Sequence, residues 1–210
     1  MAIFRKFEEH WNFRYAIDRV GNYFFEKRNK DLPWITPASI KLLDQLLTEG
    51  DVGMELGSGR STPWLASRCK LLTSVEDHKG WFNTVKEMLG ERQIDNVEYL
   101  FRENINDLGT DNPYLSCIKN ADTQSLDFVF VDGKHRDLIA LEAVTKIKKG
   151  GLLILDDSQR YIYKPTHAPH ALTNKSQMTD KWAEFQKNTS DWRKIWTTNG
   201  VSDTTIYIKK

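Results

Sequence analysis

The chain has 210 residues, a length that suits one domain, or one domain with a lid, rather than several. Its 30 basic and 29 acidic residues nearly cancel, and 11% of the residues are aromatic, which excludes a disordered tail and a polybasic nucleic-acid binder. The two cysteines, Cys69 and Cys117, provide neither a disulfide framework nor a spaced metal cluster. No apolar run approaches the roughly 20 residues that span a bilayer, and residues 1–10 do not resemble a secretion signal. We expect a cytoplasmic protein with no membrane partner.

The amino-terminal stretch, residues 1–35, is predicted to be a helical extension ahead of a main domain at 36–210. Phe4, Phe7, Trp11 and Tyr15 recur at helical spacing within it. We interpret these rings as core packing of a helix that lies across the helical layer or a ligand pocket. A partner surface, such as a homodimer contact through this helix, is the alternative.

From residue 36 on, short apolar runs alternate with stretches of helical period, which is typical of βαβ units around a parallel sheet. The predicted helices are Ala38–Leu47, Pro63–Arg68, Trp81–Leu89 and Arg136–Lys148. The predicted strands between them are Asp51–Leu56, Leu71–Glu76, Val97–Phe101, Leu126–Val131 and Gly151–Leu155. The run Lys148-Lys149-Gly150-Gly151 is expected to end the last helix.

The carboxyl-terminal part has a different pattern. Trp192–Thr198 and Thr204–Lys209 flank an Asn199-Gly200 turn, which predicts a β-hairpin. Ser158–Thr179, rich in Pro, His, Tyr and Lys, has no clear period and is interpreted as a lid over the strand ends. The expected fold is therefore α/β: a Rossmann-like, doubly wound sheet closed by an antiparallel hairpin, with helices on both faces.

The most informative stretch is Val52–Pro63, in which a strand runs into the glycine-rich turn Gly57-Ser58-Gly59 and then into a helix. Such a turn lets backbone amides approach a ligand at the carboxyl ends of the strands. Glu76 ends the next strand, where it can accept hydrogen bonds from ribose hydroxyls. The order of these features predicts an adenosine-type cofactor. Thr62 stands where dinucleotide folds carry a third glycine, and Glu55 would repel a pyrophosphate, so a cationic ligand is favoured.

These residues resemble the class I S-adenosylmethionine-dependent methyltransferases, within them the small-molecule O-methyltransferases of the catechol and bacterial sugar type. The resemblance runs from Pro33 to the last strand and rests on the segments 55–59, 74–76, 130–135 and 150–157. It implies seven strands with the last antiparallel. It also implies that S-adenosylmethionine is held by the glycine turn, by Glu76 at the ribose, and by Asn104 or Glu103 at the adenine. The cofactor-binding residues expected on this basis are Glu55, Gly57, Ser58, Gly59, Ser61, Glu76, Asn104 and Asp132.

Three carboxylates, Asp132, Asp156 and Asp157, end the fourth and fifth predicted strands. Three acids that converge are costly unless a cation lies among them. Metal-dependent relatives bind a divalent ion with two aspartates and an asparagine at matching positions, which implies Mg²⁺ or a similar hard cation here, although the third position is Asp157. The alternative is that Asp132 faces the sulfonium while Asp156 and Asp157 cap the following turn.

His135 is the preferred general base, because an imidazole titrates near neutral pH, and Lys134 is the reserve. Trp34 and Trp81 are candidate walls of the cofactor pocket. The sequence thus predicts methyl transfer to a hydroxyl of a small molecule such as a sugar or metabolite, without a nucleic-acid partner. A nicotinamide-dependent oxidoreductase and a non-catalytic cofactor-binding or assembly module remain as alternatives.

Overall fold

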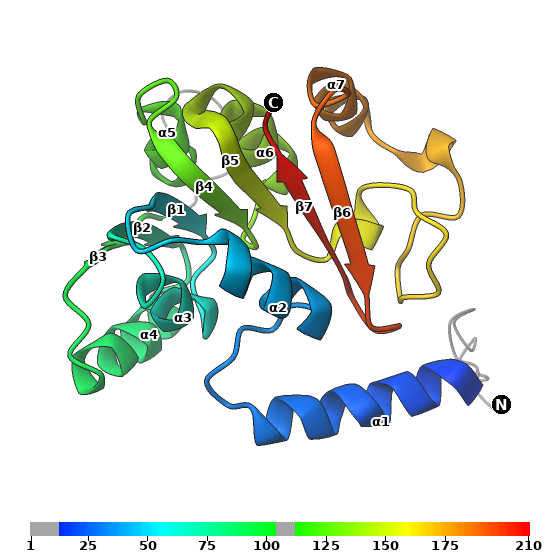
Figure 1. Ribbon diagram of the computed structural model, residues 1–210, viewed down its shortest axis with the longest axis horizontal. Helices are drawn as coiled ribbons and strands as arrows, with labels where there is room; N and C mark the ends of the chain where they lie inside the picture. Colours follow the sequence, from blue (N-terminus) through cyan, green and yellow to red (C-terminus); the bar gives the residue numbers. More distant parts are fainter. Residues whose placement is uncertain (1–12, 104–111) are drawn as a thin grey trace, which may run out of the picture.

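The computed structural model describes residues 13–103 and 112–210. Its strands form one seven-stranded sheet in the order β3-β2-β1-β4-β5-β7-β6 (Figure 1). The bounds are β1 Val52–Leu56, β2 Leu71–Glu76, β3 Val97–Phe101, β4 Leu126–Val131, β5 Ile147–Leu155, β6 Arg193–Thr198 and β7 Asp203–Ile208. The first five strands are parallel, and β7 runs antiparallel to both β5 and β6. The predicted fold is confirmed.

Helices cover both faces of the sheet: α2, α3 and α4 on one face and α5, α6 and α7 on the other (Figure 1). The bounds are α1 Phe13–Arg28, α2 Pro37–Leu46, α3 Ser61–Ala66, α4 Lys79–Glu91, α5 Pro113–Lys119, α6 Arg136–Lys146 and α7 Asp180–Asn188, with short 3₁₀ turns at Ser158–Arg160 and Lys175–Gln177. Sequence reasoning missed α5 and α7. For α5 the signal was present, since Asn112 caps it by accepting from the amides of Tyr114 and Leu115, and Pro113 occupies the first turn.

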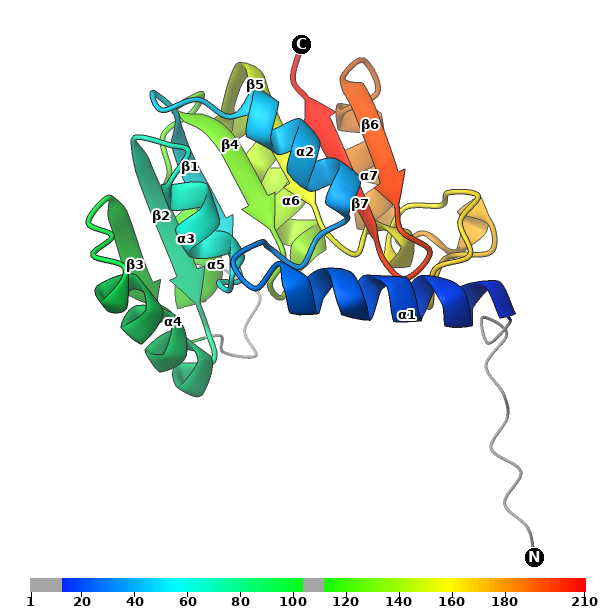
Figure 2. The ribbon, with the colours of Figure 1, turned by 60° about the horizontal axis from the view of Figure 1, so that its bottom comes forward.

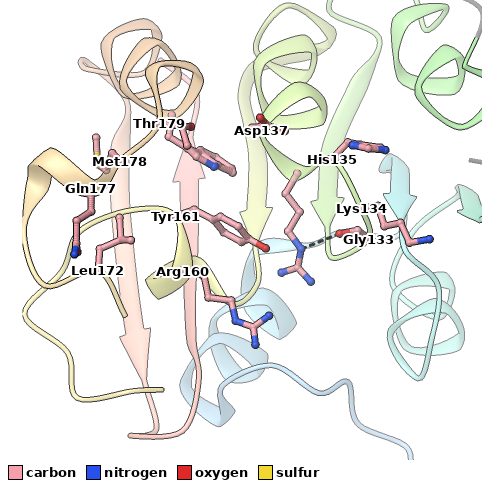
Figure 3. Close-up of a pocket in the computed structure, with 12 residues that line it drawn as sticks. Gly133, Lys134, His135, Asp137, Arg160, Tyr161, Leu172, Gln177, Met178 and Thr179 are labelled. Atoms are coloured by element: carbon pink, nitrogen blue, oxygen red, sulfur yellow. Dashed lines mark hydrogen bonds between the residues drawn. The ribbon is translucent and has the colours of Figure 1, made fainter. Parts of the chain in front are cut away.

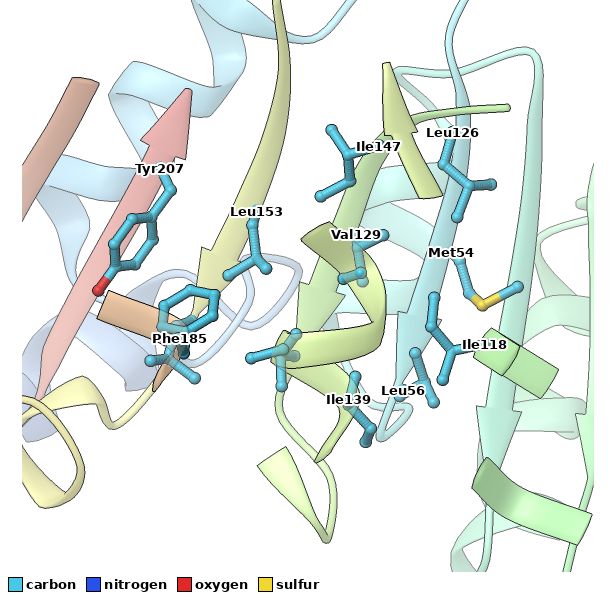
Figure 4. Packing of buried hydrophobic residues seen from close by; sticks show 14 of the residues in the cluster. Met54, Leu56, Ile118, Leu126, Val129, Ile139, Ile147, Leu153, Phe185 and Tyr207 are labelled. Atoms are coloured by element: carbon cyan, nitrogen blue, oxygen red, sulfur yellow. The ribbon is translucent and has the colours of Figure 1, made fainter. Parts of the chain in front are cut away.

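Strand β4 shows how the core is divided. Phe128 and Phe130 point to the α2–α3 face, while Val129 and Val131 point to the α5–α7 face, and all four are buried. Figure 4 shows the second of these clusters, with Val129 beside Leu153 and Ile139. Because both faces are covered, the central strands are nearly continuous apolar runs, which made their positions predictable.

The predicted end of α6 is wrong. The helix ends at Lys146, and Ile147 already belongs to β5, where it pairs with Leu126 and is buried. The polar run that was expected to form a turn lies within the strand. It does so through an irregularity in the β4–β5 register, a positive φ of 79° at Gly150, and an ion pair of Lys148 with Asp127 at 2.8 Å.

Helix α1 has no buried residue, so the part of the amino-terminal extension that the structure describes does not join the core. It lies across the carboxyl edge of the sheet, below the turn between β6 and β7 (Figure 2), which it contacts through Asn22 and Asn199. Tyr15 is half-buried, whereas Phe4, Phe7 and Trp11 lie outside the described residues. Among the helices of the described part of the chain, none has the length and apolar character needed to cross a membrane.

Candidate active site

The buried side chain of Glu55 holds the glycine loop, which connects β1 to α3, through hydrogen bonds with residues of α3 and β2. This carboxylate is fully buried and accepts hydrogen bonds from Ser61 at 2.5 Å, Thr62 at 2.6 Å and Ser74 at 2.6 Å. Burial raises the pKa of Glu55 to about 7, against the lowering effect of the three hydroxyls. Glu55 and Ser61, both expected to contact the cofactor, are therefore engaged with each other beneath the loop.

The loops after β1 and β4 meet at two glycines. A Cβ atom on Gly57, whose φ is 97°, would overlap the backbone of Gly133, and one on Gly133 would overlap the hydroxyl of Tyr114. The amide of Gly133 donates to the carbonyl of Leu56 at 2.6 Å. The amide of Gly57 donates to the carbonyl of Val75 at 2.9 Å, so both glycine amides already have acceptors within the protein. The two glycines therefore allow the carboxyl ends of β1 and β4 to pack backbone against backbone.

Glu76 lies at the end of β2, as predicted, and both of its oxygens have donors. One oxygen accepts from the amide and hydroxyl of Ser58 at 3.1 and 2.8 Å, and the other accepts from the amides of Asp77 and His78. A carboxylate offers about four acceptor positions, so ribose hydroxyls would have to replace the Ser58 hydroxyl. That hydroxyl also lies 2.7 Å from the hydroxyl of Tyr99, which offers it a second partner.

Two tryptophans stand above this loop. Trp81 donates its indole N–H to the carbonyl of Ser58 at 2.7 Å and stacks on Trp34, with ring centroids 6.5 Å apart. The guanidinium of Arg60 lies 4.7 Å from the centre of the Trp34 ring. Trp81 therefore contacts the glycine loop directly, and Trp34 lies beside it through Trp81 and Arg60. Asn104 lies outside the described residues, and Glu103 is exposed.

A cation does lie among the strand-end acids, and it is Arg136. Its guanidinium donates to the Asp132 carboxylate at 2.7 Å and to the carbonyls of Asp132, Gly133 and Asp156. Burial and repulsion by neighbouring carboxylates raise the pKa of Asp156, and burial raises that of Asp132 against the opposing effect of Arg136. The protein itself thus supplies the positive charge that the sequence required.

The predicted divalent-metal site is not supported by this arrangement. Within residues 13–103 and 112–210, no group of three His, Cys, Asp or Glu side chains is placed to hold an ion. Asp156 accepts from the Thr204 hydroxyl at 3.0 Å, and Asp157 accepts from Ser202 and pairs with Arg160. Asp156 thus binds β7 and Asp157 binds the hairpin turn and Arg160. The alternative that both acids cap the turn after β5 is not met either, since Asp157 occupies the cap position of that turn without a side-chain cap hydrogen bond.

The two candidate bases lie at the rim of a pocket of about 710 Å³, the α6–α7 pocket (Figure 3). His135 precedes α6 with a left-handed backbone, φ 50°. The Lys134 ammonium pairs with Asp77 at 2.7 Å, and a paired ammonium has no lone pair to accept a proton. Tyr161, from the predicted lid, stacks on Trp182 with centroids 5.1 Å apart and forms an aromatic wall.

A second pocket, the strand-end pocket, has about 430 Å³ and lies between α1 and the carboxyl ends of β4 and β5. Arg19, Asn22 and Glu26 of α1 line it opposite the strand-end acids Asp132, Asp156 and Asp157. The predicted catalytic pair and the predicted metal ligands are thus brought to different pockets, although Asp132 and Gly133 are consecutive. Arg136, which joins the two sides, was missed by sequence reasoning; the need for a cation among three acids was the signal that could have found it.

No protein-family model matches the sequence, and no curated protein matches it significantly. Solved structures do match over nearly the whole chain. A SAM-dependent methyltransferase from Aquifex aeolicus is 15% identical, with 95% of this chain and 100% of that chain covered and a TM-score of 0.53. A Staphylococcus aureus protein provisionally named a caffeoyl-CoA O-methyltransferase is 16% identical over 96% and 95%, at 0.61. A Clostridium thermocellum protein provisionally named an rRNA methylase is 15% identical over 82% and 94%, at 0.57.

The strand order with an antiparallel β7, the glycine loop and these likenesses define one class. The chain has the class I S-adenosylmethionine-dependent methyltransferase fold, as the sequence resemblance implied. The strand order differs from the 3-2-1-4-5-6 sheet of dinucleotide-binding dehydrogenases, so the two folds are distinct.

Proposed function

We propose that this protein transfers a methyl group from S-adenosylmethionine to a hydroxyl group of a small molecule. The observation that carries the proposal is the meeting of the two backbone loops at Gly57 and Gly133, with Glu76 at the end of β2, at the carboxyl edge of a methyltransferase sheet. A ligand that lies against the strand-end backbone and presents a ribose hydroxyl to Glu76 in place of the Ser58 hydroxyl fits this arrangement.

The cofactor supplies a methyl group on a positively charged sulfur when it is bound. Gly57, Ser58 and Gly59, whose amides donate to Val75, Glu76 and Thr62, would border its amino-acid part. Glu76 would accept from its ribose after the Ser58 hydroxyl turns toward Tyr99. Asp132, whose side chain is one-third exposed at 34%, is the strand-end acid available to face its ammonium.

We place the acceptor in the α6–α7 pocket because Gly133 lines that pocket and also touches the glycine loop. Its volume falls in the range of small-molecule sites. Tyr161 and Trp182 offer a flat apolar wall for the acceptor, and Arg160 offers donors. His135 would take the hydroxyl proton as the oxygen–carbon bond forms, which leaves a methyl ether and a neutral thioether.

RNA is the second acceptor class to test, since structural neighbours bear the names of an rRNA methylase and a tRNA methyltransferase. The near-neutral charge of the chain supports the small acceptor, because RNA binding draws on a basic surface. The alternative of a cofactor-binding module without turnover predicts binding and no transfer.

Calorimetry with S-adenosylmethionine, S-adenosylhomocysteine and NAD tests the cofactor. We expect the first two to bind, and Glu76→Ala to weaken binding by roughly 1–3 kcal/mol, the cost of lost hydrogen bonds to a charged acceptor. Glu98→Ala, on the exposed part of neighbouring β3, is the matched control and should leave affinity unchanged. Binding of NAD alone would contradict the proposal.

The transfer itself is measured with methyl-labelled cofactor against two sets of acceptors, hydroxylated small molecules and structured RNA. Label in a small molecule supports the proposal. Label in RNA alone, or tight cofactor binding with no label transferred in either set, would move the function to one of the two alternatives.

A further inference from the structure

Helix α1 turns its polar face toward the rest of the protein and its apolar face toward solvent. The face toward the body is polar: Asn22 accepts a hydrogen bond from Asn199 at 2.9 Å, Asp18 lies against Gly200, and Glu26 lines the strand-end pocket. Phe25 is the apolar side chain on this face, and it is partly buried against the α2–α3 core. A helix normally packs its apolar stripe against the core, so the outer face of α1 requires an explanation.

That outer face carries a regular apolar stripe. Phe13, Ile17, Val20 and Phe24 are 83%, 56%, 55% and 50% exposed. Their spacing of four, three and four residues is the seam of a coiled coil, in which alternate positions of one helix fit between those of another helix. The seam is one residue wide on each turn, narrower than the broad apolar face of a helix that lies in a lipid interface.

We propose that the stripe is a homodimer interface in which α1 packs antiparallel against α1 of a second copy across a two-fold axis. The stripe is self-complementary for this arrangement. Phe13 would face Phe24 of the partner subunit, and Ile17 would face Val20 of the partner subunit, so one register fills all four layers. A two-fold interface requires this reciprocity. Here it follows from the spacing of the four stripe residues, which is the same when read in either direction along the helix.

The flanks of the seam permit the close approach of two helices. Ala16 and Gly21 lie on either side of its centre, and a Cβ atom added to Gly21 would meet nothing within 4 Å. The four stripe side chains together with Tyr23, itself 55% exposed, offer on the order of 600 Å² per copy. A symmetric pair would bury about 1,200 Å² in total, at the lower end of the range for specific interfaces.

The proposed interface does not depend on the reaction that the protein catalyses, but it would affect the strand-end pocket. The polar face of the same helix supplies Arg19, Asn22 and Glu26 to the strand-end pocket, so a dimer that holds α1 also holds one wall of that pocket. Monomeric protein would keep this wall only through contacts such as Asn22 with Asn199.

Sedimentation velocity of the full chain over a concentration series tests the proposal. We expect a concentration-dependent dimer, and Val20→Glu should raise its dissociation constant at least tenfold. Leu71→Glu is the matched control: Leu71 is 42% exposed at the amino-terminal end of β2, at the opposite edge of the sheet from α1, and the dimer should survive there. Monomer at every concentration, or a dimer insensitive to Val20→Glu, overturns the proposal.

Two further measurements fix the occupant and the register. Mixed Ile17→Cys and Val20→Cys chains should form the disulfide between unlike chains in preference to like chains, with peptide mass spectrometry separating these from Cys69 and Cys117. A preference for like chains would refute the antiparallel register. Flotation with phosphatidylglycerol vesicles should leave the wild type unbound; a monomer that floats and loses binding in Val20→Glu would assign the stripe to a membrane instead.

Discussion

Replacing Glu55 with glutamine removes the ionisation of a carboxyl group that is buried under the glycine loop. The pKa of this group rises from 4.5 to about 7 on folding, mainly through burial. The unfolded chain therefore releases this proton at a lower pH than the folded chain. The stabilisation from protonated Glu55 is fully present below pH 4.5 and is lost as the pH rises through 7.

The size of the effect follows from the shift. One pKa unit corresponds to about 1.36 kcal/mol, so the wild type should lose about 2.5 kcal/mol relative to Glu55→Gln between about pH 5 and pH 8. Glutamine suits the site because its carbonyl can accept from Thr62 and Ser74, which share one carboxylate oxygen, while its amide can donate to Ser61.

Urea unfolding of both proteins at the two pH values, followed by tryptophan fluorescence, measures the difference. Glu98→Gln, at an exposed carboxylate on β3, is the control and should show no such pH dependence. A difference between wild type and Glu55→Gln that is constant to within about 0.5 kcal/mol would show that Glu55 is not a buried, proton-binding anchor of the loop.

Three further predictions concern the site. Arg136→Met leaves Asp132 and Asp156 without their cation and should lower the free energy of unfolding by about 3–5 kcal/mol near pH 8. The loss should be smaller near pH 5, because the pKa values of both carboxyl groups are raised and the groups become protonated there. An equal loss at both pH values, measured by urea unfolding, would show that packing and not charge is lost. His135→Asn keeps a residue that tolerates the left-handed backbone and should lower turnover about 10²-fold with unchanged cofactor affinity, whereas full activity would place the base elsewhere. Tyr114→Phe removes a buried hydroxyl that has no hydrogen-bond partner among residues 13–103 and 112–210, so thermal unfolding should show stabilisation of about 1 kcal/mol; destabilisation would reveal a partner.

The strands of the sheet could be predicted from the sequence where burial on both faces makes a strand a continuous apolar run. Strands β2, β3 and β4 fall at the predicted ranges. Central β4 is covered on both faces and is therefore apolar except for Asp127, so the polar residues beyond it mark its ends. Strand β3 lies at the edge of the sheet, and its β-branched and aromatic residues identified it instead. Short α5 and α7 gave too few turns for a periodic signal, although α5 carried its cap. The end of α6 failed because Gly150 and a register irregularity let a polar run continue a strand.

The candidate site divides in the same way. Features that depend on one segment of the chain could be predicted from the sequence. They are the glycine turn, the position of Glu76 at the end of its strand, and the requirement for a cation among the strand-end acids. The identity of that cation was not, because Arg136 reaches Asp156 across β4 and β5 only when the loops after both strands meet. For the same reason the inward role of Glu55 could not be separated from a ligand contact.

The sequence by itself therefore determined the order of the elements, the carboxyl-edge location of the site and the residue types available there, since each of these is a local pattern along one strand or turn. The tertiary structure decided which side chains meet: the hydroxyls that hold Glu55, the guanidinium that takes the place of a metal, the two separate pockets, and the outward stripe of α1. These are contacts between segments far apart in the chain, and only packing determines which face of a strand or helix they occupy.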